Sequence, residues 1–224
     1  MKALDLPPPH LRPAGSETAL GGLRVVDFSH FVAGPYCTVM LADFGADVLK
    51  IEHPDRGDDM RHARYAPGDD VGSPFIWGNR NKRSVGLDLS TQAGRDVARA
   101  LVDSADILVE NFSTGVMGRL GLGYEEVSQS NPRLIYCSIS AAGRSGPLAH
   151  RAGFDSIAQA ESGFMSVNGH PGDPPVVCGA PVKDMTTAMM ACNAILAAIV
   201  ARERLGKGQF VEISLFDQGV AMLG

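Results

Sequence analysis

The feature that most constrains the fold of this chain lies in residues 23–52, where two short apolar runs flank one helical pattern. LRVVDFS (23–29) and VLKIE (48–52) are rich in aliphatic and β-branched residues and are typical of buried strands. Between them, residues 34–44 carry apolar side chains at helical spacing, and Gly45 is a helix stop. A strand, a helix and a second strand in this order predict two parallel strands joined by a right-handed crossover.

The same alternation continues along the chain. The further expected strands are 83–89, 107–111, 134–140 and 210–216, and the expected helices are 91–104, 114–120, 124–130, 155–162 and 183–205. Ser90 is the expected N-cap of the 91–104 helix, because a serine oxygen can accept an N–H bond from the first turn. Repeated units of this kind stack helices on the faces of one sheet. The expected fold is α/β, with a Rossmann-like open parallel sheet and flanking helices.

Three stretches depart from this alternation. Residues 1–20 contain Pro-Pro-Pro and are expected to form a flexible lead-in. Residues 53–78 are rich in Gly, Pro and charge, and polar excursions of this length often carry function. Residues 185–201 are apolar, but threonine and asparagine interrupt them, and they fall short of the ~20 residues of a membrane span. A buried helix, and no membrane, is expected there.

Composition argues against several classes of partner. The 224 residues carry a net charge of −5, whereas nucleic-acid binding favours a basic balance. The four cysteines lie far apart without a CxxC pair, so neither a zinc site nor a thioredoxin motif is indicated, and no metal is expected. Such cysteine usage fits a reducing compartment, so the expected location is the cytoplasm.

The common nucleotide and hydrolase motifs do not occur. The first expected strand is followed by SHFVAGP (29–35) rather than by GxGxxG. GRLGLGY (118–124) has a glycine pair, but it follows an expected helix instead of a strand. Neither a Walker A P-loop nor a GxSxG nucleophile elbow is present. A dinucleotide-binding or ordinary hydrolase function is therefore not indicated.

Seven segments, in order, carry a resemblance to a known family. They are 21–58 (with FSHFVAGP), 79–95, 105–127, 131–140, 153–165, 178–189 (CGAPVKDMTTAM) and 195–218. In sequence and spacing they resemble the family III CoA-transferases, which include formyl-CoA, carnitine and bile-acid CoA-transferases and the α-methylacyl-CoA racemases. The resemblance runs from residue 21 to the end of the sequence.

The resemblance implies an enzyme that moves CoA from an acyl-CoA donor to a small carboxylic acid. Such transferases use an aspartate as covalent nucleophile, which forms an acyl-aspartyl anhydride and then an aspartyl-CoA thioester. The matching position is Asp184, between a Gly-Ala-Pro turn and the long expected helix. The N–H groups at a helix N-terminus are expected to favour its ionised form. On local sequence alone, Asp184 is an ordinary carboxylate at a helix end.

The resemblance also implies a set of contacts to CoA, which is a substrate here and not a permanently bound cofactor. The expected contacts are His30, Phe31, Val32, Ala33, His53, Leu87, Asp88, Leu89, Ser90, Asn111, Phe112, Ser113, Arg119, Leu120, Phe154 and Asp155. Arg119 matches a phosphate-binding arginine, with a solvated helix arginine as the alternative. His53 stands where the family often has a basic residue, so its phosphate contact should be weak at neutral pH. The NRNKR run (79–83) adds local positive charge, although a lone run of this kind is usually a soluble turn.

Position 154 distinguishes the two reactions of the family. In the racemases of the family that this chain resembles, a histidine directly precedes an aspartate. At the matching position this chain has Phe154 before Asp155. Exchange of a proton at the carbon next to the thioester needs a base within reach, and phenylalanine cannot serve as one. CoA transfer is therefore expected, with α-methylacyl-CoA racemase as an alternative.

The resemblance implies a division into domains. Residues 21–182 are expected to form the CoA-binding large domain, and residues 183–224 the long helix and the start of a second, smaller domain whose remainder is absent. Family dimers are interlocked, so the expected partner is a second copy of the chain or the missing C-terminal half. A non-catalytic or partner-dependent CoA-binding fragment is therefore a further hypothesis. The donor and acceptor acids cannot be read from these residues.

Overall fold

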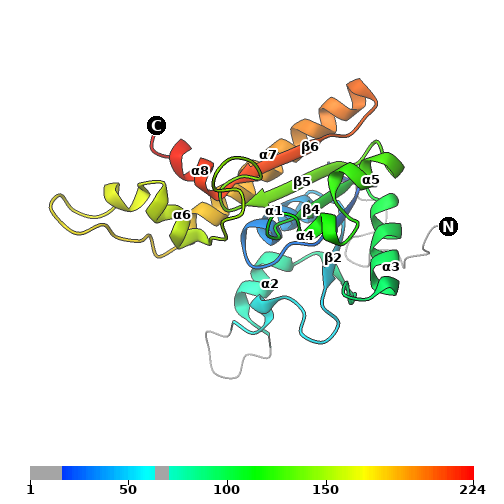
Figure 1. Ribbon diagram of the computed structural model, residues 1–224, viewed down its shortest axis with the longest axis horizontal. Helices are drawn as coiled ribbons and strands as arrows, with labels where there is room; N and C mark the ends of the chain where they lie inside the picture. The colour runs from blue at the N-terminus through cyan, green and yellow to red at the C-terminus, as the bar shows by residue number, and fades with distance from the viewer. Residues whose placement is uncertain (1–16, 64–70) are drawn as a thin grey trace.

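A computed structural model describes residues 17–63 and 71–224 and confirms the α/β fold (Figure 1). The described strands form one parallel sheet in the order β3-β2-β1-β4-β5-β6. They are β1 (Arg24–Asp27), β2 (Asp47–Glu52), β3 (Lys82–Gly86), β4 (Ile107–Glu110), β5 (Ile135–Ser140) and β6 (Phe210–Ser214). The helices are α1 (Ala33–Asp43), α2 (Ser73–Asn79), α3 (Gln92–Asp103), α4 (Val116–Arg119), α5 (Tyr124–Ser130), α6 (Asp155–Glu161), α7 (Val182–Leu205) and α8 (Leu215–Ala221), with 3-10 turns η1 (Asp59–Arg61) and η2 (Phe164–Val167).

The strand order reverses at β1. The chain moves outward from β1 through β2 to β3, then returns to the other side of β1 and continues through β4 and β5 to β6. Val25 of β1 accordingly lies opposite Val48 of β2 on one side and Ile107 of β4 on the other. The connections that leave β1 and β4 diverge at this point, and open α/β sheets bind ligands in the crevice so formed at the carboxyl ends of the strands.

Both faces of the sheet are buried, because successive side chains of each strand point to opposite faces. Val25 belongs to a core cluster with α1 and α7, in which Ile195 of α7 is fully buried. Val26 belongs to a second cluster on the opposite face, with Leu101 of α3 and Val127 of α5. The two layers hold the strand ends in place, and with them the loops at the carboxyl edge.

α7 is a core helix of this domain. Among the described helices it is the one long and apolar enough to span a membrane by length and composition. Here Ala188, Ala191 and Ile195 are fully buried in the cluster shared with α1 and the sheet. β6 follows α7 and pairs with β5 in the same sheet. Residues 183–214 thus contribute a core helix and the last strand of the sheet, and the domain division expected at residue 183 stays a prediction.

The cap of α3 differs from the prediction. The Thr91 hydroxyl accepts the Gly94 N–H at 3.0 Å and caps the helix. The expected cap, Ser90, instead donates its hydroxyl to Asp88 at 2.6 Å. The strand before this turn, β3, ends at Gly86 rather than at Leu89, because residues 87–90 turn toward the helix.

The sequence pattern did not predict helices α8 and α2. β6 ends at Ser214, whose hydroxyl accepts the Asp217 N–H at 3.0 Å and starts α8, so the last residues of the expected strand are helical. The polar excursion of 53–78 contains η1 and α2, and its residues 64–70 lie outside the described part of the chain. Residues 1–16 of the expected lead-in also lie outside it.

α6, η2 and α8 form a corner beyond the end of the sheet, where Figure 1 shows α6 and the residues after it reaching away from the strands. α6 and α8 pack against each other and against α7. The approach of α6 and α8 is close, since a Cβ at Gly219 would lie 2.5 Å from Ser162 Cβ. This packing places the N-terminus of α7 beside the carboxyl edge of the sheet.

Candidate active site

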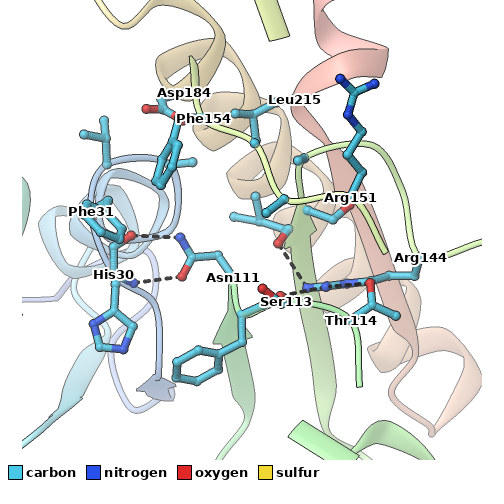
Figure 2. A pocket seen from close by; sticks show the side chains of 18 of the residues that line it. His30, Phe31, Asn111, Ser113, Thr114, Arg144, Arg151, Phe154, Asp184 and Leu215 are labelled. Carbon is cyan, nitrogen blue, oxygen red and sulfur yellow. Dashed lines mark hydrogen bonds between the residues drawn. The ribbon is translucent and has the colours of Figure 1, made fainter. Parts of the chain in front are cut away.

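A cavity of about 360 Å³ lies at the carboxyl edge of the sheet, beside the reversal between β1 and β4 (Figure 2). Its walls come from the turn after β1 (30–33), the loop after β2 (53–59), the residues after β4 (111–114) and the segment from the end of β5 to the start of α6 (139–154), with Asp184 and Leu215. These segments meet because the carboxyl ends of neighbouring parallel strands share one edge. The size and concave shape are those of a small-molecule site.

Asn111 fixes the turn after β1. Its side-chain amide donates to the His30 carbonyl oxygen and accepts the His30 N–H, both at 2.8 Å (Figure 2). The turn is tight, because a Cβ at Gly34 would lie 2.1 Å from Ser29 Cβ, so glycine is required there. The connections after β1 and β4 therefore form one wall of the cavity.

Asp184 lies in the first turn of α7 and lines the cavity. The buried residue Asp155, at the start of α6, holds this turn through one carboxylate oxygen, which accepts the N–H of Lys183 at 2.6 Å and of Asp184 at 3.0 Å. The Gln159 amide donates to the other oxygen. Asp155 is not among the residues that line the cavity and joins α6 to α7, so its expected contact with CoA stays a prediction.

Burial raises the pKa of Asp184 to about 7, and the nearby Asp155 carboxylate adds to the rise. Burial and Asp155 therefore oppose ionisation and outweigh the effect expected of the helix N-terminus. The N–H groups of Lys183 and Asp184, which would stabilise a negative charge, are already bonded to Asp155. Both protonation states of Asp184 are thus populated near neutral pH.

Three arginines line the cavity, and two of them have carboxylate partners. Arg144 pairs with Glu110 at 2.9 Å, and Arg151 pairs with Glu161. Arg56, in the loop after β2, is exposed and forms no ion pair with the residues that the structure describes. Its guanidinium is therefore the most available of the three for an anionic ligand.

The cavity brings together a large part of the predicted site. His30, Phe31, Val32, Ala33, His53, Asn111, Phe112, Ser113, Phe154 and Asp184 all line it. Leu87, Asp88, Leu89, Ser90, Arg119 and Leu120 do not. Residues 87–90 form the turn into α3, and Arg119 is exposed at the end of α4. Their contacts to a long ligand stay predictions.

The arginines of the cavity were not among the expected site residues. Arg56 lies in the polar excursion of 53–78, whose composition indicated a functional segment without indicating a residue. Arg144 and Arg151 lie between β5 and α6, where no periodic pattern gave a signal.

The NRNKR run gives little free positive charge, contrary to expectation, because the structure pairs its cations with aspartates. Arg80 pairs with Asp43, Lys82 with Asp27 at 3.0 Å, and Arg83 with Asp47 at 2.5 Å. None of the three cations lines the cavity.

Known proteins resemble this chain in sequence. Residues 20–224 match the family model described as CoA-transferase family III. A succinate–glutarate CoA-transferase from Agrobacterium fabrum is 41% identical and aligns with 91% of this chain and 52% of its own length. A succinyl-CoA:mesaconate CoA-transferase from Haloarcula hispanica is 44% identical, with coverages of 91% and 53%. An acetyl-CoA:oxalate CoA-transferase from Acetobacter aceti is 43% identical, with coverages of 94% and 54%.

Solved structures resemble it as well. A CAIB/BAIF family protein from Brucella suis superposes with a TM-score of 0.89 at 39% identity, covering 93% of this chain and 56% of that protein. A protein from Mycobacterium tuberculosis superposes with a TM-score of 0.86 at 35% identity, covering 92% and 57%. The chain spans about half the length of the curated relatives that it matches.

Proposed function

Since this chain belongs to CoA-transferase family III, we propose that it takes part in moving CoA from an acyl-CoA donor to a carboxylic acid, with Asp184 as the nucleophile. The observation that carries the proposal is the position of Asp184, a carboxylate at the start of α7 that faces a cavity between the β1 and β4 connections. The named relatives act on dicarboxylic acids, namely glutarate, mesaconate and oxalate. A dicarboxylic acid is therefore the proposed acceptor class.

The proposed reaction has four balanced steps. A carboxylate oxygen of Asp184 attacks the thioester carbonyl carbon, the C–S bond breaks, and CoA thiolate leaves an acyl-aspartyl anhydride. The thiolate then attacks the aspartyl carbonyl, which releases the donor acid as its carboxylate and leaves an aspartyl-CoA thioester. The acceptor carboxylate displaces the thiolate to form a second anhydride. Attack of the thiolate on the acceptor carbonyl gives the new acyl-CoA and restores Asp184.

Trapping tests this proposal directly. The chain is incubated with succinyl-CoA, treated with hydroxylamine or borohydride, and digested for mass spectrometry. The expected product is a hydroxamate or alcohol at Asp184. A chain that binds CoA in calorimetry but gives no modification there, alone or with a C-terminal partner, is a CoA-binding module and not the proposed enzyme.

Racemase chemistry has less support from the cavity. Phe154 and Asp184 both line the cavity (Figure 2), and Phe154 stands where the racemase alternative needs an acid–base group. Its ring cannot accept the proton next to a thioester. Deuterium uptake by a 2-methylacyl-CoA in heavy water would instead support the racemase.

Adduct formation should depend on pH through Asp184. The ionised carboxylate is the nucleophile, and the pKa of Asp184 is raised to about 7 by burial and by Asp155. Between pH 6 and pH 8 the ionised fraction, and with it the initial rate of adduct formation, should rise about tenfold. Quench-flow mass spectrometry across this range measures it.

The Asp155→Asn variant is the matched control. Asparagine keeps an oxygen for the two N–H groups of α7 and removes the negative charge, so the midpoint of the pH profile should move to lower pH. A flat wild-type profile from pH 5.5 to 8.5 would contradict the role given to Asp184.

Arg56 should bind a phosphate of CoA. Its guanidinium is exposed, lines the cavity and has no carboxylate partner in the described chain. Arg56→Ala is expected to weaken CoA binding by about 1–3 kcal/mol, because a charged hydrogen bond is lost. Calorimetry at low salt measures it, with Arg204→Ala in the last turn of α7 as the control.

Arg119→Ala is predicted to weaken CoA binding over the same range and tests the contact that the family resemblance implies. Added salt should reduce the difference between each variant and the wild type, because exposed charges are screened. If CoA affinity is unchanged in Arg56→Ala and Arg119→Ala alike, both phosphate contacts are wrong.

A further inference from the structure

Phe31 adopts a backbone conformation that L residues rarely use. Its φ is +63°, in the left-handed region, and it lies in the turn after β1 that lines the cavity. A bulky residue keeps such a conformation only where its surroundings impose it. The groups that hold Phe31 in this left-handed conformation therefore indicate which side chain the turn positions in the cavity.

A single ion pair bonds to this turn on both sides of His30. Lys50 donates from Nζ to the Ser29 carbonyl oxygen at 2.8 Å, and Asp58 Oδ1 accepts the Phe31 N–H at 3.4 Å. Lys50 and Asp58 pair with each other at 2.9 Å. The carbonyl before His30 and the N–H after it are thus fixed by one pair of side chains.

The ion pair is buried and does not line the cavity. The side chains of Lys50 and Asp58 are 1% and 0% exposed. Two buried charges are seldom more stabilising than an apolar pair of the same volume, so stability alone does not account for them. Asp58 Oδ1 also accepts the Met60 N–H at 3.0 Å, which links the loop after β2 to the turn after β1. The bonds of the pair thus go to the backbone of the turn after β1 and of the loop after β2.

The turn held by this ion pair sets the position of an aromatic ring in the cavity that Asp184 lines. The Phe31 and Phe154 rings meet edge to face, with centroids 5.6 Å apart and planes at 80°. Both line the cavity, which Asp184 also lines (Figure 2). Edge-to-face packing of this kind depends on how each ring is presented. A change of backbone conformation at Phe31 would separate the two rings.

We propose that the Lys50–Asp58 pair is a positioning element that holds Phe31 against Phe154, and that the two rings shield acylated Asp184 from water. The shielding part rests on the proposed function, because it concerns the acyl-aspartyl anhydride and the aspartyl thioester. Water that reaches either intermediate adds to its carbonyl and releases the free acid, so CoA transfer is lost. An apolar wall beside the carboxylate opposes this hydrolysis.

Fluorine NMR tests the positioning without any turnover. The chain is labelled with 4-fluorophenylalanine, and the resonances are assigned by single substitutions. In the Lys50→Met/Asp58→Leu variant, the Phe154 resonance should move to where it lies in Phe31→Ala, because both variants remove the ring current of Phe31. A Phe154 resonance that stays at its wild-type position overturns the proposal.

The control removes a different ion pair, which is only partly buried. Arg202 and Asp106 pair at 3.1 Å, and Asp106 directly precedes β4, at the edge of the sheet opposite the cavity. The Arg202→Met/Asp106→Leu variant should leave the Phe154 resonance in place. If it moves the resonance as far as the Lys50/Asp58 variant does, the effect is general loosening and the proposal fails.

The lifetime of acylated Asp184 tests the shielding. Phe31→Ala and Lys50→Met/Asp58→Leu should each shorten it by about tenfold, and the combined variant should shorten it no further, because both changes act through one ring. Effects that multiply would contradict the proposal. A wild-type chain that forms no adduct refutes the proposed function, and the NMR result still decides the positioning role.

Asp58→Asn is the second variant, for the case that the double substitution prevents folding. It keeps an oxygen for the Phe31 N–H and removes the charge that pairs with Lys50. The Phe154 resonance should then broaden or shift part of the way toward its Phe31→Ala position. An unchanged resonance in folded Asp58→Asn counts against the ion pair.

Discussion

The Asp184→Asn variant is expected to lose covalent adduct formation by at least about 1,000-fold, because an amide is not a nucleophile toward a thioester. The substitution keeps the size of the side chain and leaves the bonds from Asp155 to the start of α7 in place. CoA binding measured by calorimetry should stay within about threefold of the wild type. Quantitative mass spectrometry of the trapped peptide measures the loss.

The stability of the same variant checks the environment of Asp184 independently of turnover. The pKa of Asp184 rises from 3.8 to about 7 on folding, so the folded state holds the proton more tightly than the unfolded state does. The wild type should therefore lose stability as pH rises from about 4 to about 7. The asparagine side chain of the variant has no charge to bury, so its stability should not change with pH from this source.

Urea denaturation at several pH values provides the measurement. Near pH 3.5 the titration of Asp184 should cause little difference in the free energy of unfolding between the two proteins. At pH 8 Asp184→Asn should be more stable, with about 4 kcal/mol as the ceiling that the pKa shift allows. A variant that still forms the trapped product would remove Asp184 as the nucleophile. A variant that is less stable at pH 8 would show that the carboxylate is not held in an unfavourable environment.

The fold was largely predictable because its signals are local. Each β-α-β unit shows its strand and helix periods within a few tens of residues, so the parallel sheet followed from the pattern of 23–52 and its repeats. The predicted ends of helices and strands were wrong where a single side chain decides where the element ends. The Ser214 hydroxyl ends β6 and starts α8, and the apolar pattern across 210–216 does not distinguish the strand from the helix.

The site was predictable to the extent that the family resemblance supplied it. Local sequence made Asp184 a helix-end carboxylate, and the resemblance made it the expected nucleophile. Its raised pKa was not predictable, because it depends first on burial in the folded chain and then on Asp155, a neighbour in space but not in sequence. The free positive charge expected of the NRNKR run was wrong for the same reason, since the aspartates that pair with its cations lie on α1, β1 and β2.

The buried cation of that run has a structural role, which its contacts define. Lys82 donates from Nζ to Asp27 at 3.0 Å, and both side chains are nearly inaccessible, at 2% and 0% exposure. Ser29 and Thr38 also donate to Asp27, Thr38 at 2.6 Å. Burial opposes ionisation, but the charges of Lys82 and Lys50 hold the pKa of Asp27 below its usual range. Asp27 is therefore a carboxylate in the core, at the end of β1.

Lys82→Met is expected to lower the free energy of unfolding by about 3–5 kcal/mol at pH 7, because it removes a charge partner from the buried Asp27 carboxylate. Urea denaturation followed by circular dichroism measures the loss. The control is Arg133→Met, which breaks an exposed pair with Glu203 and should cost less than about 1 kcal/mol. Adding Asp27→Asn to Lys82→Met should recover part of the loss, since the buried charge is then gone. Equal, small losses in the two single variants would mean that Asp27 does not depend on Lys82, and that Ser29, Thr38 and Lys50 suffice to hold it.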